Sequence, residues 1–182
     1  MKIQLTNVRL AFNDLFKAVP FKDGDPTYNG TFLIPKGSAL AKQVEAAAIA
    51  ALNTKFPGKG EAIRKQIDGN NNKCCIQDGD KQAYDGFAGN IAVRAKAPVS
   101  KRPLVIDRDK TPLTEADGRI YSGCYVNASI EFFGYDNTGK GLSAQLRGVQ
   151  FYKDGDSFGG GTPASADEFE EVTEGADADD LA

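Results

Sequence analysis

Alternation of apolar and polar residues recurs along the first 156 residues and predicts a protein built mainly of β-strands. It is clearest over residues 121–135, where Val126, Ala128, Ile130 and Phe132 share one face and polar or aromatic residues share the other. The same alternation predicts further strands at residues 2–12, 28–34, 73–76, 87–97, 102–106 and 142–152.

Two of these strands change the parity of their apolar positions, which marks a β-bulge. Near residues 6 and 7 the apolar face shifts from Leu5 to Val8, and Phe12 follows the new parity toward the core. Gly148 is the expected bulge in the last strand. Since a bulge bends the strand that holds it, the sheet is expected to curl.

One long segment has the period of a helix rather than that of a strand. Residues 38–53 are rich in alanine, Ser38 is the expected N-cap, and residues 61–67 should add a short second helix. An apolar stripe should pack on the sheet: Leu40, Val44, Ala48, Ala51 and Leu52. Bulged strands with one helix between early strands predict a small curled barrel or an open sandwich.

Charge divides the chain into two parts of opposite sign. Eight of the 25 acidic residues and no basic residue follow residue 163, which leaves 22 basic and 17 acidic residues in 1–163, a net charge of +5. Residues 157–163 read as a flexible glycine-rich linker. We therefore predict a folded domain over 1–156 and a linker with a disordered acidic tail over 157–182.

The tail has two interpretations. It is either a solubilising appendage or a mobile polyanion that competes with nucleic acid for the basic body. Its acidic residues with one aromatic ring among them could also dock on a protein partner, and the candidate docking residues are Asp167, Glu168, Phe169, Glu170, Glu171, Asp179 and Asp180.

The composition removes several kinds of chemistry. The chain has no histidine, which excludes histidine-based catalysis, and its odd number of cysteines, three, suggests no disulfide framework. We find no phosphate-binding glycine motif and expect no catalytic residue, cofactor or metal. No apolar stretch approaches the roughly 18 residues of a membrane span, and the N-terminus does not resemble a signal peptide, so the cytoplasm is the expected location.

Polar faces of three predicted strands mix basic with aromatic residues, and loops add further basic residues. Single-strand binders need both kinds of residue, because cations follow the phosphates and rings stack on exposed bases. The candidate nucleic-acid-binding residues are Arg94, Lys96, Lys101, Arg102, Arg108, Tyr125, Phe133, Tyr135, Arg147 and Tyr152.

Two other functions fit parts of the sequence. A β-rich structural or assembly protein with a solubilising tail would explain the alternation and the charge. A magnesium-dependent nuclease could use Asp78, Asp80 and Asp85, although their glycine-rich surroundings are also typical of a turn.

A set of short motifs gives the chain a resemblance to a known family. They are VRLAF at 8–12, LF at 15–16, YNGTFLIPK at 28–36, DGD at 78–80, RPLVID at 102–107, IYSGCYV at 120–126, GKGLSAQL at 139–146, GVQF at 148–151 and DG at 154–155. Together they resemble the single-stranded DNA-binding proteins encoded in the replication modules of tailed phages.

The resemblance implies a fold, a function and partners. The fold would be mainly β with minor α, an OB-fold-like curled antiparallel barrel with an inserted helix and a disordered acidic tail. The function would be sequence-tolerant binding of single-stranded DNA in phage replication or recombination, in the cytoplasm of the host cell. The tail would then recruit replication proteins of the phage or the host, no membrane would be involved, and a monomer and a homodimer fit equally.

Overall fold

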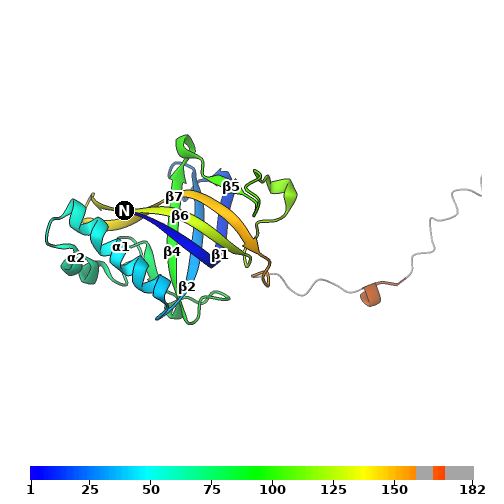
Figure 1. Cartoon of the computed structure of the whole chain (residues 1–182), viewed down its shortest axis with the longest axis horizontal. Helices are drawn as coiled ribbons and strands as arrows, with labels where there is room; N and C mark the ends of the chain where they lie inside the picture. Colours follow the sequence, from blue (N-terminus) through cyan, green and yellow to red (C-terminus); the bar gives the residue numbers. More distant parts are fainter. Residues whose placement is uncertain (159–165, 171–182) are drawn as a thin grey trace, which may run out of the picture.

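The computed structural model of the protein describes residues 1–158 and 166–170. Its body is a barrel of strands with two helices at one end (Figure 1). The strands are β1 (Lys2–Val19), β2 (Thr27–Pro35), β3 (Ile76–Asp78), β4 (Asn90–Pro98), β5 (Leu104–Ile106), β6 (Tyr125–Asp136) and β7 (Lys140–Lys153). The helices are α1 (Ala39–Lys55) and α2 (Gly60–Ile67).

One sheet closes on itself to make the barrel. In the described part of the chain the strand order is β3-β4-β2-β1-β6-β7-β5, and a parallel bridge between Lys96 of β4 and Gln145 of β7 joins the two ends of the five central strands. The edge strands β3 and β5 have three residues each and lie outside the closed ring. This confirms the predicted OB-like curled barrel and decides against an open sandwich.

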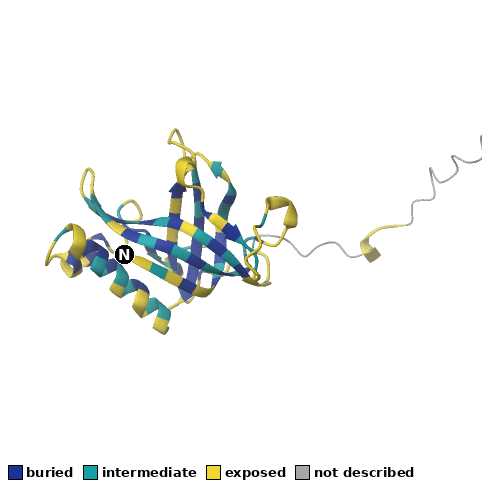
Figure 2. Ribbon diagram, turned by 45° about the horizontal axis from the view of Figure 1, so that its top comes forward, coloured by how far each residue is buried: buried dark blue, intermediate teal, exposed yellow. Residues whose placement is uncertain are grey.

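The inward faces of the strands carry the core that the alternation predicts. Figure 2 shows buried and exposed positions alternating along the strands of the barrel. The predicted core residues of β6 and β7 are all buried: Val126, Ala128, Ile130, Phe132, Leu142, Ala144, Leu146, Val149 and Phe151. Both predicted bulges are present, one between Leu5 and Val8 and one beside Gly148.

Helix α1 follows β2 and lies against β6 at one end of the barrel (Figure 1). The predicted stripe faces the core, with Val44, Ala48, Ala51 and Leu52 buried. Ser38 is the N-cap, and its hydroxyl accepts a hydrogen bond from the backbone N–H of Ala41 at 3.1 Å. The second predicted helix is confirmed as α2.

Replacing Ser38 with alanine should lower the free energy of unfolding by about 1 kcal/mol, because it leaves a backbone donor of the first helical turn without its cap. Urea denaturation of the whole chain measures the change. The matched control is Ser38→Asp, which keeps a capping oxygen and should retain most of the stability. Equal losses in the two variants would contradict the capping role.

Several predicted strand ends are wrong, and glycines or bulges account for them. Strand β1 passes the predicted end at Phe12 through an irregular stretch before Asp14. Strand β4 begins at Asn90 rather than at residue 87, because Gly89 takes a left-handed φ of 76°. Strand β6 begins at Tyr125 rather than at residue 121, after Gly123 with a φ of 114°.

Two short strands also begin later than predicted. Strand β3 covers Ile76–Asp78 and not residues 73–76, since a turn ends at Lys73, Cys74 forms only an isolated bridge to Leu142, and a bend follows at Cys75. Strand β5 begins at Leu104, two residues after the predicted start. Both are edge strands. The bounds of each are set by pairing with one neighbour, β3 with β4 and β5 with β7, and not by alternation of apolar and polar residues within the strand.

Candidate nucleic-acid interface

Five of the predicted basic residues are exposed on β4, on β7 and on the segments before and after β5, which pairs with β7. We call them the basic face: Lys96, Lys101, Arg102, Arg108 and Arg147. Lys96 is exposed on β4 opposite Gln145 of β7, and Arg147 is exposed two residues further along β7. Two neighbouring strands of the closed barrel therefore hold these two cations on the same outer surface.

Loops bring the other cations of the basic face to the same strand. Lys101 ends the 3-10 turn that follows β4, and Arg102 comes next. The chain then enters β5, which pairs with β7 from Gly148 onward. Arg108 follows β5, and its carbonyl accepts a hydrogen bond from Nε2 of Gln150 on β7 at 3.3 Å.

One cation of the basic face already has an acidic neighbour. Nη1 of Arg147 lies 3.1 Å from Oε2 of Glu131 on β6. Both side chains are partly exposed, and ion pairs of this kind stabilise a protein by about 0–1 kcal/mol. The Arg147 guanidinium can therefore exchange this carboxylate for a phosphate at small cost.

Arg94 shares the outer face of β4 with Lys96, but its guanidinium is bonded to the loop before β3. Its Nη2 donates to the carbonyls of Asn71 at 2.6 Å and Cys74 at 3.4 Å, so it ties the loop before β3 to the barrel. The side chain remains exposed. Arg94 thus holds a loop through backbone carbonyls. Among the described contacts, the other predicted cations of β4 and β7, Lys96 and Arg147, have no such role.

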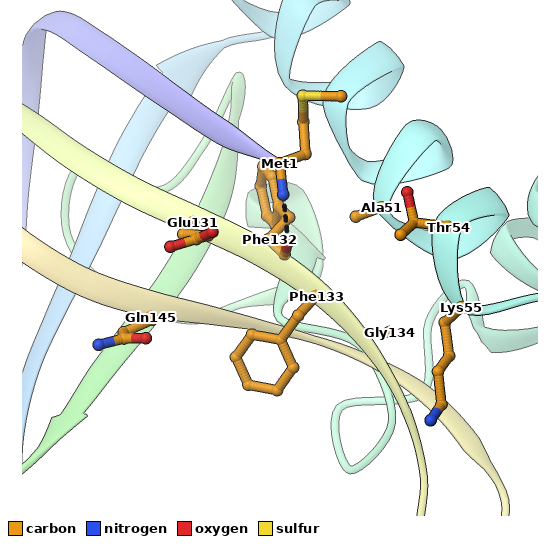
Figure 3. Close-up of a pocket in the computed structure, with 9 residues that line it drawn as sticks. All are labelled: Met1, Ala51, Thr54, Lys55, Glu131, Phe132, Phe133, Gly134 and Gln145. Atoms are coloured by element: carbon orange, nitrogen blue, oxygen red, sulfur yellow. Dashed lines mark hydrogen bonds between the residues drawn. The ribbon is translucent and has the colours of Figure 1, made fainter.

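Two of the predicted aromatic residues are exposed on the outside of the barrel. Phe133 of β6 is 44% exposed and Tyr152 of β7 is 38% exposed. Phe133 borders an open hollow of about 390 Å³ between α1 and the strands β6 and β7. Figure 3 shows Phe133 beside Glu131 and Gln145, across from the residues of α1.

The other two predicted aromatic residues contact other parts of the chain. The Tyr135 hydroxyl donates to the carbonyl of Asn72 at 3.3 Å. Tyr125 lies between two cations, with the Arg9 guanidinium 5.7 Å and the Lys153 ammonium 4.6 Å from its ring centre. Both rings are half-buried, so each presents less surface than Phe133.

The chain turns back over the barrel after β7, and we call residues 154–158 the C-terminal strap. The Tyr121 hydroxyl donates to Asp154, and the backbone N–H of Phe158 donates to the carbonyl of Ser122 at 3.0 Å. The Arg9 guanidinium donates to the carbonyl of Asp156 at 2.6 Å and lies 4.1 Å from the ring centre of Phe158. Phe158, predicted as part of the linker, thus packs on the barrel.

Only a short part of the tail is described. Asp167 and Glu168 belong to a 3-10 turn, Ala166–Glu168, and Phe169 and Glu170 follow it as exposed residues. The predictions for residues 159–163 of the linker, and for Glu171, Asp179 and Asp180, fall outside the described residues.

A group of aromatic residues on the outside of the barrel, two of them exposed, was not predicted from the sequence. We call Phe12, Tyr84, Phe87 and Phe158 the outer aromatic cluster, because they gather on the outside of β1, β2 and β4. The prediction that Phe12 faces the core is wrong, since its side chain is 51% exposed. The signal that could have located Tyr84 and Phe87 is the glycine-rich segment around them, where Gly86 and Gly89 take left-handed φ angles.

Two of the three carboxylates of the nuclease hypothesis hold a loop, whereas the third, Asp85, is exposed and borders the cavity beside Tyr84. Asp78 and Asp80 both form an ion pair with Lys36, and Asp80 accepts a hydrogen bond from the backbone N–H of Gly89 at 2.7 Å. The bond from Lys36 holds the pKa of Asp78 below its usual value, and the bonds from Gly89 and Lys36 do the same for Asp80. These bonds weaken as the pH falls through the lowered pKa values.

The described residues contain neither a candidate metal site nor a candidate membrane-spanning helix. Residues 1–158 and 166–170 contain no group of three acidic or cysteine side chains arranged to hold a metal ion. No helix in the same ranges is long and apolar enough to cross a membrane.

Comparison with known proteins defines the class of this barrel, which is that of the phage single-stranded DNA-binding proteins. The structure of the single-stranded DNA-binding protein from bacteriophage Enc34 in complex with ssDNA matches with a TM-score of 0.72 and 27% identity, over 87% of this chain and 89% of that one. The gp2.5 single-stranded DNA-binding protein of bacteriophage T7 shares the fold, with a TM-score of 0.57 and 17% identity over 94% and 96% of the two chains.

The particular family follows from the sequence. The family model described as Enterobacter phage Enc34, ssDNA-binding protein, matches residues 1–182, and the chain belongs to this family. Protein p50 of Acyrthosiphon pisum secondary endosymbiont phage 1 is 49% identical over 176 residues, 95% of each chain. Single-stranded DNA binding is the activity by which the family is described, which confirms the resemblance seen in the sequence motifs.

Proposed function

We propose that this protein binds single-stranded DNA along the basic face, with little dependence on base sequence, during phage DNA replication or recombination. The observation that carries the proposal is the gathering of five cations from two strands and two loops beside one strand, β7. Phosphates would follow these cations, and bases would stack on the exposed rings of Phe133 and Tyr152.

The remaining predicted residues contribute less in this proposal. Arg94 keeps an exposed guanidinium but also holds the loop before β3. Tyr125 and Tyr135 are half-buried against other segments. We expect these three to shape the surface and to add weaker contacts with DNA.

The acidic tail competes with DNA for the basic body in our proposal, and it also recruits replication proteins. Its eight acidic residues stand next to a body of net charge +5 over residues 1–163. A tethered polyanion raises the local concentration of negative charge at the binding surface and disfavours weak ligands such as duplex DNA. The protein would act in the host cell cytoplasm and would carry out no catalysis.

The direct test is binding to labelled oligo-dT and to a duplex of equal length across a salt series. The expected result is tight binding to the single strand that weakens with salt, at a log–log slope of about −0.7 per phosphate contacted. Absence of binding at low salt would reject the proposal and favour the structural or assembly protein. Cleavage of the oligonucleotide with added magnesium would favour the nuclease.

Removing residues 164–182 should strengthen DNA binding, because it removes eight negative charges and leaves the C-terminal strap intact. We expect a gain of roughly tenfold for duplex DNA at 50 mM salt, which shrinks at 300 mM as screening increases. A full-length variant with all eight tail acids replaced by their amides is the matched control and should behave like the truncated chain. Unchanged duplex binding in both would leave the tail as a solubilising appendage.

A further inference from the structure

The outer aromatic cluster leaves two large rings exposed around a cavity. The ring centres of Phe12 and Tyr84 are 4.8 Å apart, and both rings pack on Phe87, at 5.8 and 5.3 Å. Phe87 is buried, whereas Phe12 and Tyr84 are 51% and 55% exposed. The cavity measures about 280 Å³, which is room for one planar ring system. Exposed apolar surface of this kind marks a binding site more often than single exposed residues do.

The backbone of β1 is distorted in a way that presents Phe12. The register with β2 shifts between Ala11 and Asp14, and Phe12 has a left-handed φ of 47°, which is unfavourable for a bulky residue. As a result, Phe12 packs on Phe87 and Ala11 belongs to the same outer cluster as Phe87, although adjacent strand residues normally point to opposite faces. Bulges that re-aim a side chain are typical of functional sites.

The cluster lies on the face with which OB domains bind oligonucleotides. Beneath it, Leu33 of β2 pairs with Ala92 of β4, the second and third strands of the closed barrel. OB domains use this second- and third-strand face. From Ala92, the next outward positions of β4 are Arg94 and Lys96, about 7 and 13 Å along the strand. A strand of DNA on these cations can reach the cavity.

We infer that the cavity of the outer aromatic cluster takes one unpaired nucleobase, which packs against Phe12 and Tyr84 while its phosphates lie toward Arg94 and Lys96. This inference rests on the proposed function: it extends the path of the DNA from Lys96 of the basic face along β4 to a separate base-binding pocket. A nucleobase suits the site because it is flat and apolar on its faces. It also arrives with the negative charge that the neighbouring cations attract.

The absence of tryptophan from the chain provides a reporter. In Tyr84→Trp, the new indole is the sole source of tryptophan fluorescence, and a base stacked on it should quench that fluorescence. Oligo-dT should quench strongly, and an abasic oligomer of equal length should quench little, because it has the phosphates without the bases. Equal responses to the two oligomers, or no response to either, would overturn the inference.

Phe12→Gly gives an independent measurement. Glycine adopts a left-handed φ without strain, so the backbone of the bulge can persist without the ring. Affinity for oligo-dT should fall roughly five- to 150-fold, the loss of one stacked base, and affinity for the abasic oligomer should stay the same. Comparison of the unfolding curves with that of the parent protein identifies any loss that comes from misfolding.

The outcomes separate this inference from the proposed function. If Phe12→Gly binds oligo-dT like the parent protein while Lys96→Gln binds less, the pocket has another occupant, such as a side chain of a protein partner, and the proposed function stands. If the parent protein itself binds no single-stranded DNA, the proposed function fails first, and the inference fails with it.

Discussion

Single-strand binding will fall about 100-fold at 0.1 M salt when Lys96, Arg102 and Arg147 of the basic face are replaced together by glutamine. The size of this loss follows from counterion release. At a slope of about −0.7 per phosphate, each contact raises the affinity roughly fivefold at 0.1 M relative to 1 M salt. Three lost contacts should also make the slope shallower by about 2. Titration of labelled oligo-dT at four or more salt concentrations measures both quantities.

The matched control changes the same amount of charge elsewhere. Lys42, Lys59 and Lys65 are exposed on and around the two helices, outside the basic face. Their replacement by glutamine should alter the affinity only slightly and leave the slope almost unchanged. If both triple variants lose affinity equally, DNA responds to the net charge of the body, and the basic face is not the binding surface.

Phe132→Ala should lower the free energy of unfolding by about 3–5 kcal/mol, because it opens a cavity in the core. Phe132 is 1% exposed and belongs to the main core cluster. Thermal or urea unfolding of the purified protein measures the loss. A change below 1 kcal/mol would mean that the core beside α1 is looser than the burial of Phe132 indicates.

The next residue along β6 is the natural control. Phe133 is 44% exposed on the outer face, so Phe133→Ala should change stability little. Its affinity for oligo-dT should instead fall roughly five- to 150-fold, if a base stacks on the ring. Normal affinity in Phe133→Ala would remove this ring from the proposed interface and leave stacking to the other exposed aromatics.

The parts of the fold that the sequence predicts are those with a local cause. Alternation places Val126 through Phe132 in the core, Ser38 caps its helix through its own backbone, and a parity change reveals the bulge before Val8. Each of these signals lies within a few residues of the feature that it predicts. The same is true of the overall class, since bulged strands curl into barrels.

What the sequence does not reveal depends on contacts between distant segments. The bulge at Phe12 has no parity change of its own, and its ring is accommodated by Tyr84 and Phe87, more than 70 residues later. The exposure of Tyr125 depends on the C-terminal strap, whose Gly155 lies against its ring. Alternation finds which face a residue occupies, but it does not show what folds over that face.

The pairing of β1 with β6 has a consequence for how each molecule is made. Lys2 lies opposite Glu131, so 129 residues must be synthesised after the first partner before the second exists. At about 5–20 residues per second, this interval lasts about 6–26 s. During it, one edge of β1 has no native partner, and unpaired edges are templates for wrong associations. The barrel therefore closes late in translation. Until β6 has been made, the nascent chain has an open sheet edge at β1.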